Sequence, residues 1–235
     1  MRLPGPGRPG ARDGRGRCRL RRRRAVTPAP SSRVSLRSAV TEGEPMTDQT
    51  SAVVEALPLP LLIRIVNEYG DAPRSAAGES ASPYPPADAL GQEDTAFWAH
   101  RAAPQEKVLV ETANLLHPVF AAASGGECAD RLNTVIAEAG LTPAMTAREW
   151  DVREQWRTCR PGRTLLAAAT LALLHHLRSD PDVSRLGTCL GDACVDVFVD
   201  SSPGRRRQYC SLTCQNRART RAYRARRAAA SRSAQ

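Results

Sequence analysis

The sequence predicts a mainly α-helical body followed by a small cysteine-rich C-terminal module. Three observations lead to this expectation. Aromatic residues make up only 4% of the 235 residues, and the apolar residues are rich in Ala, Leu and Val, a composition that favours helices. Apolar residues recur at helical spacing between residues 46 and 184. Four of the seven cysteines lie between residues 189 and 214.

Charge divides the chain into three segments. Residues 1–45 contain 12 Arg and 3 acidic residues, residues 46–184 contain 11 basic and 18 acidic residues, and residues 185–235 contain 11 Arg and 3 acidic residues. An acidic middle between basic ends is expected of a folded body joined to a module that meets a polyanion. The longest apolar run, Leu165–Leu174, is too short to cross a bilayer. We therefore expect a soluble, cytoplasmic protein.

The first basic segment, residues 1–45, has too few large apolar residues to fold, so we expect it to be disordered. It has three interpretations: a nucleic-acid-binding tail around Arg21–Arg24, a transit-like leader, or an extension translated from a misassigned start. We favour the last, because Met46 begins a segment of ordinary composition. The extreme C-terminus, residues 229–235, is also expected to be disordered.

Periodicity predicts four helices in the body, residues 46–184. The first covers residues 59–69, although its Ile and Val content would also suit a short strand. A loop is expected over residues 70–93, which are rich in Pro, Gly, Ala and Ser. The second starts near Asp94 or Gln105 and ends before Pro118. The third covers residues 130–139, with Gly140 as its stop signal. The fourth and most apolar, residues 162–178, is expected at the centre of the core.

Other residues of the body do not indicate catalysis. His175 and His176 end a helix, where the helix dipole favours an imidazolium. The isolated Cys128 and Cys159 are expected to be small buried or incidental thiols rather than nucleophiles. Trp150 and Trp156 are expected in the core rather than stacked on a ligand. The sequence contains no nucleophile elbow, phosphate-binding loop, metalloprotease or dinucleotide motif. We therefore expect that the protein is not an enzyme.

The C-terminal cysteines have the spacing of a metal site. Cys189 and Cys194 form a C-x4-C pair, and after fifteen residues Cys210 and Cys214 form a C-x3-C pair. Two close pairs let two short turns converge on one Zn²⁺, which takes four thiolates at tetrahedral corners. Disulfides are disfavoured in the cytoplasm, and an iron–sulfur cluster is a minor alternative with the same donors. The sequence predicts one zinc ion per chain.

A treble-clef-like or ribbon-like finger, residues 185–228, fits this spacing. Residues 195–200 alternate as in a strand, residues 201–204 form a turn, and residues 205–209 would be the returning strand of a hairpin. Ser211 is a plausible N-cap, which places Cys214 in the first turn of a helix.

The helix after Cys214 has a predicted basic flank. At 100° per residue, Ala218, Ala222, Ala225 and Ala229 form a stripe suited to close packing. Guanidinium groups along one flank, together with the hairpin arginines, could contact phosphates and read guanine, and Asn216 could read adenine. The predicted nucleic-acid-binding residues are Arg205, Arg206, Arg207, Asn216, Arg217, Arg221 and Arg224. A solvated Arg-rich tail is the competing interpretation.

These residues resemble the CGNR zinc finger of bacterial transcription regulators. The resemblance rests on FVDSS at residues 198–202, on RRxYCS ending at Ser211, and on CQNRARTRAYRARR from Cys214. The namesake tetrapeptide is Cys214-Gln215-Asn216-Arg217, with Gln in place of the usual Gly. The second cysteine pair has three intervening residues, where the family more often has four. Metal binding tolerates both departures, although an altered helix entry could change what the helix reads.

The body, residues 46–184, resembles the ABATE domain that precedes this finger in the family, through LLIRIVNEYGDAPR at residues 61–74 and LHPVFAAA at residues 116–123. The resemblance implies a stress-induced transcription regulator whose body senses a small-molecule ligand or dimerises while the finger binds DNA. The alternative is a zinc-dependent module that binds RNA or protein. Only Tyr209 and Tyr223 accompany the arginines, which favours duplex DNA over single strands. A homodimer would let two fingers read paired half-sites.

Overall fold

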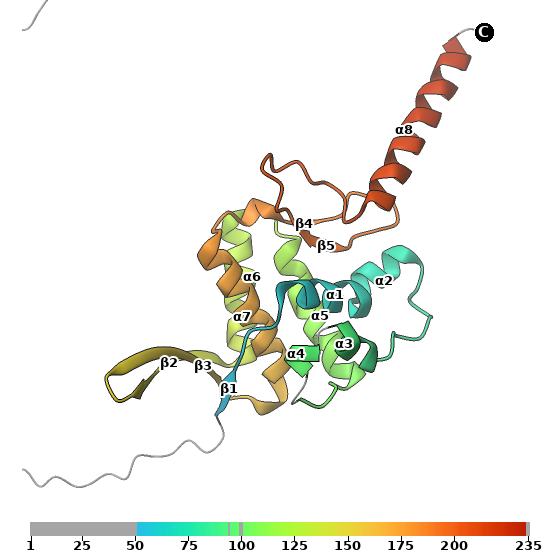
Figure 1. The fold of residues 1–235 in the computed structure, drawn as a ribbon. Coiled ribbons are helices and arrows are strands. Elements are labelled where there is room, and N and C mark those ends of the chain that lie inside the picture. Colours follow the sequence, from blue (N-terminus) through green and yellow to red (C-terminus); the bar gives the residue numbers. More distant parts are fainter. Residues whose placement is uncertain (1–50, 94, 99–100, 234–235) are drawn as a thin grey trace, which may run out of the picture. The chain divides into compact units, whose positions relative to one another are not determined.

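The structure is a computed structural model that describes residues 51–93, 95–98 and 101–233. The expectations for residues 1–45 lie outside these ranges. A helical body is joined to a short C-terminal module that ends in a long helix (Figure 1). The helices are α1 (Leu59–Tyr69), α2 (Asp71–Ala77), α3 (Asp88–Glu93), α4 (Thr95–Trp98), α5 (Glu106–Phe120), α6 (Gly125–Ala139), α7 (Thr164–Ser179) and α8 (Leu212–Ser233), with 3-10 turns at Pro161–Arg163 and Val183–Arg185.

Helix α7 lies at the centre of the core, as the sequence predicts. Every residue from Leu166 to Leu173 is buried. Helices α1, α5 and α6 pack around it and contribute many of the other buried side chains, including the largest: Tyr69, Phe120, Leu62 and Ile65. Helix α1 has the predicted bounds, residues 59–69.

Two helices differ from the prediction at one end. Helix α6 ends at the predicted Gly140, which adopts φ +59°, but it begins at Gly125 because the Ser124 hydroxyl accepts a hydrogen bond from the Glu127 N–H at 3.2 Å. Helix α5 continues through Pro118 to Phe120. A proline this close to the end of a helix removes only one backbone hydrogen bond, so the last turn persists.

The predicted loop at residues 70–93 is wrong, because it contains α2 and α3. Tertiary contacts stabilise α2 despite its weak local signal. The Asn114 side chain accepts a hydrogen bond from the Asp71 N–H at 2.8 Å. The Arg74 guanidinium is buried and donates to the carbonyls of Glu79 and Ser82, and these bonds fold the segment after α2 back onto the helix.

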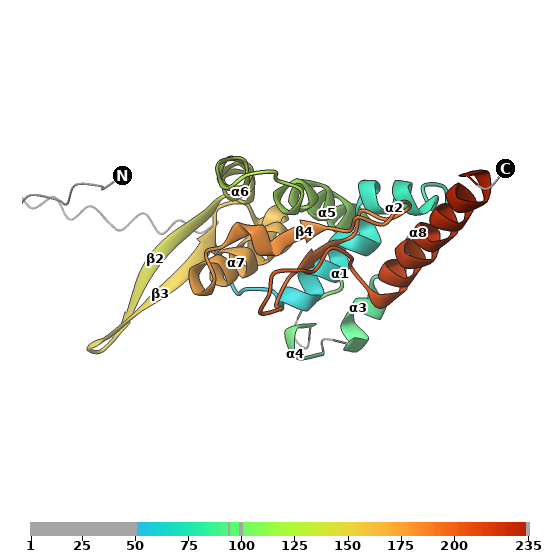
Figure 2. The same cartoon turned by 90° about the horizontal axis from the view of Figure 1, so that it is seen from above.

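A three-stranded antiparallel sheet was not predicted. Its order is β1 (Ala52–Val54), β3 (Asp151–Thr158) and β2 (Leu141–Arg148). Strands β2 and β3 pair over their whole length, from Leu141–Thr158 at the base to Arg148–Asp151 at the tip, and they extend away from the helices (Figure 2). Trp150, which we expected in the core, lies in the tip and is 99% exposed, whereas Trp156 near the base is partly buried.

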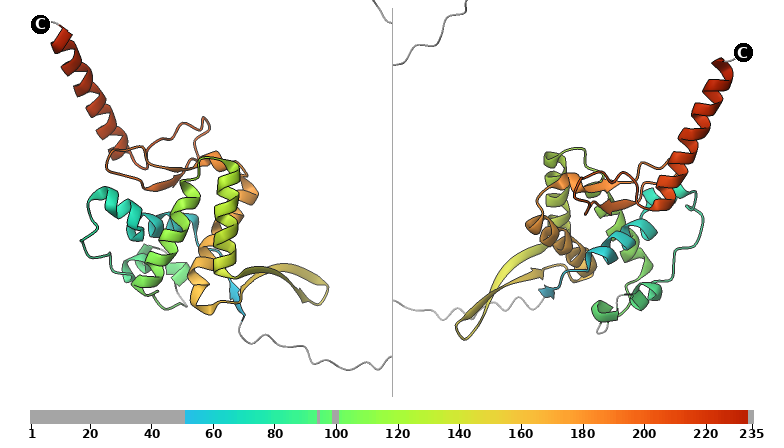
Figure 3. Two further views of the ribbon diagram at one scale, coloured as in Figure 1. Left: turned by 180° about the vertical axis from the view of Figure 1, so that it is seen from behind. Right: turned by 45° about the horizontal axis from the view of Figure 1, so that its top comes forward.

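A second, two-stranded sheet connects the body to the C-terminal module. Strands β4 (Leu186–Thr188) and β5 (Val197–Val199) pair antiparallel and contact α5. Leu186 and Val197 belong to the hydrophobic core of the body. Helix α8 extends from this sheet away from the body (Figure 3) and remains helical through Ser233, so residues 229–233 are not the predicted disordered tail. Within the described ranges, no helix has the length and apolarity needed to span a membrane.

Candidate metal centre and basic helix

The four cysteines of the C-terminal module converge on one point. The sulfur atoms of Cys189, Cys194, Cys210 and Cys214 all lie within 4.8 Å of one another. The Cys210 Sγ lies 3.6 Å from both the Cys194 Sγ and the Cys214 Sγ. Zn–S bonds of about 2.3 Å at tetrahedral corners place sulfurs roughly 3.8 Å apart, so the cluster has the dimensions of a four-thiolate zinc site. These cysteines are free rather than paired in disulfides.

Short turns position the first pair. Cys189 follows directly after β4, and its N–H donates to the Asp196 carbonyl at 2.8 Å. The chain then reverses, with the Cys194 N–H donating to the Gly191 carbonyl at 3.2 Å. A Cβ at Gly191 would lie 3.4 Å from the Cys189 Sγ, so the turn is packed closely against the sulfurs.

Helix α8 positions the second pair. Its first residue is Leu212, and the Ser211 hydroxyl accepts a hydrogen bond from the Cys214 N–H at 3.3 Å. This confirms the predicted cap and places Cys214 in the first turn, where the positive end of the helix dipole favours a thiolate. Burial raises the pKa of the Cys214 thiol, but hydrogen bonds with the Ser211 hydroxyl and the neighbouring thiols lower it by more. The pKa of Cys214 therefore lies below its ordinary value.

Burial raises the pKa of two of the other three thiols of the cluster. It raises the pKa of Cys210 to about 12, and it also raises the pKa of Cys194. The Asp196 carboxylate contributes in the same direction and lies 3.3 Å from the Cys210 sulfur. A bound dication would reverse this effect by stabilising the thiolates. The donor set and its spacing fit zinc.

The predicted hairpin is wrong in its second half. Residues 205–209 form no strand, and β5 pairs instead with β4, which precedes the first cysteine. The buried Asp200 carboxylate shapes the returning chain by accepting hydrogen bonds from the N–H groups of Ser202 (2.8 Å) and Arg207 (3.0 Å). The hydrogen bond to the Ser202 side chain and these backbone N–H groups hold the pKa of Asp200 below its ordinary value.

The predicted arginines fall into two groups. Asn216, Arg217, Arg221 and Arg224 line one shallow groove along α8, together with Thr213 and Thr220. Residues 205–207 lie elsewhere: Arg206 and Arg207 line a separate hollow beside Gln215, which is on nearly the opposite side of α8 by helical geometry. The single contiguous arginine surface that we predicted is therefore not formed.

Two of the hairpin arginines have partners within the chain. Arg207 stacks on the Phe198 ring, with 4.9 Å between its guanidinium carbon and the ring centroid, and donates to the carbonyls of Tyr209 and Cys210. Arg205 forms an ion pair with Asp182. Both side chains therefore help to hold the returning chain in place. Arg206 is exposed.

The alanine stripe does not pack as predicted. Ala218 is partly buried, but Ala222, Ala225 and Ala229 are exposed. The groove side of α8 is equally open, although Arg221 forms an ion pair with Asp192 of the first cysteine turn. Helix α8 therefore contacts the cysteine turns through residues of its first half and presents most of its surface to solvent.

Two residues of the body anchor the module, and neither was predicted from the sequence. The Asn67 side chain accepts from the Val197 N–H at 2.7 Å and donates to the Val197 carbonyl at 3.1 Å. The His117 Nε2 donates to the Val195 carbonyl at 3.0 Å. Asn67 thereby occupies the open edge of β5 as a neighbouring strand would. Because 130 residues separate Asn67 from Val197, no local sequence signal could have revealed this contact.

The C-terminal module also matches a known zinc-finger family in sequence. The family model described as CGNR zinc finger matches residues 185–227. This range contains all four clustered cysteines, β4, β5 and the groove residues of α8. No curated protein matches the chain.

Proposed function

We propose that the protein is a cytoplasmic bacterial transcription regulator that binds one zinc ion through Cys189, Cys194, Cys210 and Cys214 and binds DNA through α8. The observation that carries the proposal is the position of the basic groove directly after the sulfur cluster. Zinc would supply a rigid cross-link between the two cysteine turns, and its loss would free the N-terminus of α8. The proposed role is binding rather than catalysis.

The groove residues have the chemistry of a DNA contact. Arg217, Arg221 and Arg224 provide guanidinium groups for phosphates or guanine, and Asn216 provides an amide that can pair with adenine. An exposed helix about 22 residues long has the dimensions to enter a major groove. In this proposal the body, residues 46–184, is an ABATE-like domain that senses a stress signal or ligand.

The test compares two double variants of the zinc-loaded full chain for binding to a genomic DNA library. Arg217→Ala with Arg221→Ala removes groove side chains, whereas Arg219→Ala with Arg226→Ala removes the same charge from the other side of α8. We expect the groove variant to lose about 30-fold or more in affinity, and the matched control much less. If three arginines contact phosphates, log affinity should fall with log salt at a slope of about −3.

Recovery of a recurrent sequence motif that Cys214→Ser abolishes would support a sequence-specific regulator. Equal losses in the two double variants would mean that α8 is a diffuse basic tail. A flat salt response would contradict DNA binding and favour the protein-interaction alternative, and stronger binding to RNA than to DNA would favour the RNA alternative.

A further inference from the structure

The tip of the β2–β3 hairpin has two features that the fold itself does not require. Strands β2 and β3 are joined by the two residues Glu149 and Trp150. Glu149 has φ +57°, a conformation that favours Gly or Asn in such turns. Trp150 is 99% exposed. A strained backbone that displays a large apolar side chain to water costs stability, which indicates that the tip serves a contact outside its own chain.

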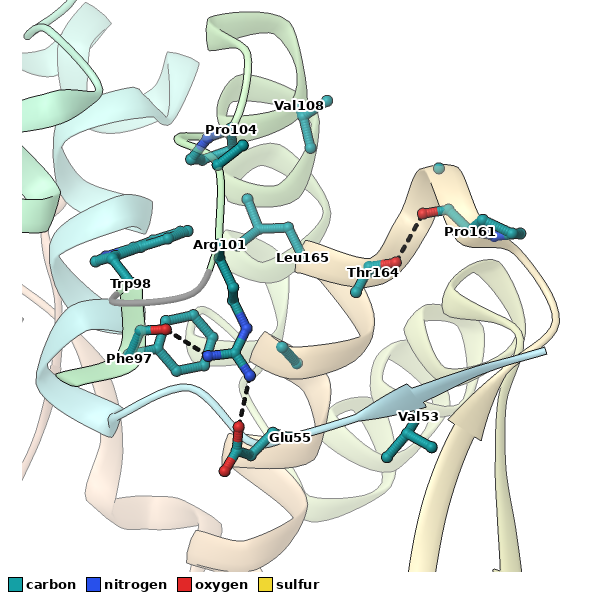
Figure 4. Close-up of a pocket in the computed structure, with 13 residues that line it drawn as sticks. Val53, Glu55, Phe97, Trp98, Arg101, Pro104, Val108, Pro161, Thr164 and Leu165 are labelled. Carbon is teal, nitrogen blue, oxygen red and sulfur yellow. Dashed lines mark hydrogen bonds and ion pairs between the residues drawn. The ribbon is translucent and has the colours of Figure 1, made fainter. Parts of the chain in front are cut away.

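The same chain contains an apolar cavity of about 440 Å³ beside α4, which we call the α4 pocket (Figure 4). Its walls come from β1, α4, the start of α5 and the start of α7. The side chains that form them are predominantly apolar: Val53, Phe97, Trp98, Pro104, Val108 and Leu165. A cavity of this size has room for an indole ring and falls within the range of binding pockets.

The mouth of the α4 pocket is charged in a way that suits the hairpin tip. Glu55 and Arg101 form an ion pair there, and the Glu55 side chain is 73% exposed (Figure 4). Around Trp150 the chain carries charges of both signs: Arg148 and Glu149, and Asp151 and Arg153, which form an ion pair with each other. The tip can therefore offer an arginine to Glu55 and a carboxylate to Arg101 while the indole enters the apolar cavity.

The positions of tip and pocket suit reciprocal docking. Val53 of the pocket wall pairs with Arg157 near the base of the hairpin, so pocket and hairpin base are neighbours. Trp150 lies seven residues from Arg157, at the opposite end of β3, or roughly 24 Å away at 3.4 Å per residue. When two such hairpins lie side by side in opposite directions, each tip reaches the base of the other and hence the other's pocket. This is a closed two-fold arrangement.

We propose that the protein forms a two-fold homodimer in which Trp150 of each copy occupies the α4 pocket of the other. The proposal goes beyond zinc and DNA binding and does not depend on either. Its readout is the mass of the protein in solution, so its failure is distinguishable from the failure of DNA binding.

The test uses the full chain and two variants that each remove one half of the contact. Trp150→Ala removes the indole from an exposed position. Gly162→Phe fills the pocket, because Gly162 lines it and a Cβ there would meet no atom within 4 Å. Tyr223→Ala, which truncates an exposed aromatic residue of α8, is the matched control. Sedimentation and native mass spectrometry report the species present.

We expect dimeric wild type and dimeric Tyr223→Ala. Truncation of a buried interface tryptophan typically weakens binding about 30-fold or more for each contact, and each variant loses both contacts of the dimer. Trp150→Ala and Gly162→Phe should therefore each be monomeric. Their mixture should form a heterodimer, because Trp150 of the Gly162→Phe chain can enter the intact pocket of the Trp150→Ala chain.

A wild type that stays monomeric at about 100 μM, where a dimer with a Kd of about 1 μM would dominate, would overturn the proposal. So would a dimer that survives Trp150→Ala. If Gly162→Phe does not fold, Ala102→Trp fills the pocket from another exposed position. Failure of the mixed variants to associate, with both of them folded, would show that Trp150 and the pocket do not meet.

Discussion

Gly140 shows how one residue sets the direction of a whole element. It ends α6 and is followed at once by β2, and its φ of +59° lies in the left-handed region. A Cβ at this position would lie 2.8 Å from the Cys159 Sγ and 3.0 Å from the Arg160 Cγ. Two costs therefore oppose any side chain here, one from the backbone conformation and one from close packing.

Gly140→Ala should lower the free energy of unfolding by more than about 1 kcal/mol, because the new methyl group adds steric overlap to an unfavourable φ. Gly162→Ala is the matched control, since its Cβ would meet no atom within 4 Å and its φ is not positive. We expect a change within about 0.5 kcal/mol for the control. Urea unfolding of the full chain measures both. Equal effects would contradict the role assigned to Gly140.

At the candidate metal centre, local residues were predictable and distant partners were not. The cysteine spacing and the Ser211 cap depend on residues close in sequence, so the pattern revealed the cluster. The partner of Arg207 depends on the path of the returning chain, and that path is set by the Asp200 carboxylate. The contact of Arg207 with nucleic acid stays a prediction, and its stacking on Phe198 could not be foreseen from the neighbouring sequence.

Among the secondary structure elements, the helices were predictable where their apolar periodicity was strong. Helices α1 and α7 have buried faces that the sequence shows directly. The β2–β3 hairpin lacked such a signal, because its strands contain Pro143 and many charged residues, and its turn has no Gly or Asn. Pairing with β1, from a distant part of the sequence, attaches the base of this hairpin to the body.

Removing the metal should affect the elements of the module unequally. Strands β4 and β5 contribute Leu186 and Val197 to the core of the body, so they should stay folded. The cysteine turns are linked by a backbone hydrogen bond from the Leu190 N–H to the Gln208 carbonyl at 2.9 Å. The contacts of Asp200 and Arg207 hold the returning chain, and we expect the metal to be the main further link between the two turns. Helix α8 has little buried surface beyond Cys214, Gln215 and Ala218, and most of the stability of a helix in a protein comes from tertiary packing.

Hydrogen exchange of the zinc-loaded full chain, with and without a chelator, tests this expectation. Peptides covering residues 189–194, 208–214 and α8 should lose protection, while peptides covering β4 and β5 should retain it. Unchanged protection in α8 would show that the metal does not stabilise the helix. Simultaneous loss in β4 and β5 would show that the whole module depends on the ion.

For the whole molecule, the contact between body and module determines whether they behave as one unit. Charge suggested an acidic body and a separate basic module, but the two share buried apolar residues in α1, α5, β4 and β5. Asn67 completes this junction by satisfying both backbone groups of Val197, a residue that is 1% exposed. Composition could not reveal the junction, because it is made of few residues from distant segments.

Asn67→Ala should lower the free energy of unfolding by about 2 kcal/mol, because it leaves a buried N–H and a buried carbonyl of Val197 without partners. Asn114→Ala is the matched control: its amide also accepts from a backbone N–H and donates to an oxygen, here the N–H and the carboxylate of Asp71, but in an exposed setting. We expect less than about 1 kcal/mol for the control. Urea unfolding measures the stability, and hydrogen exchange at Val197 reports the junction directly. If Asn67→Ala costs no more than Asn114→Ala and Val197 stays protected, the Asn67 hydrogen bonds do not hold the body and the module together.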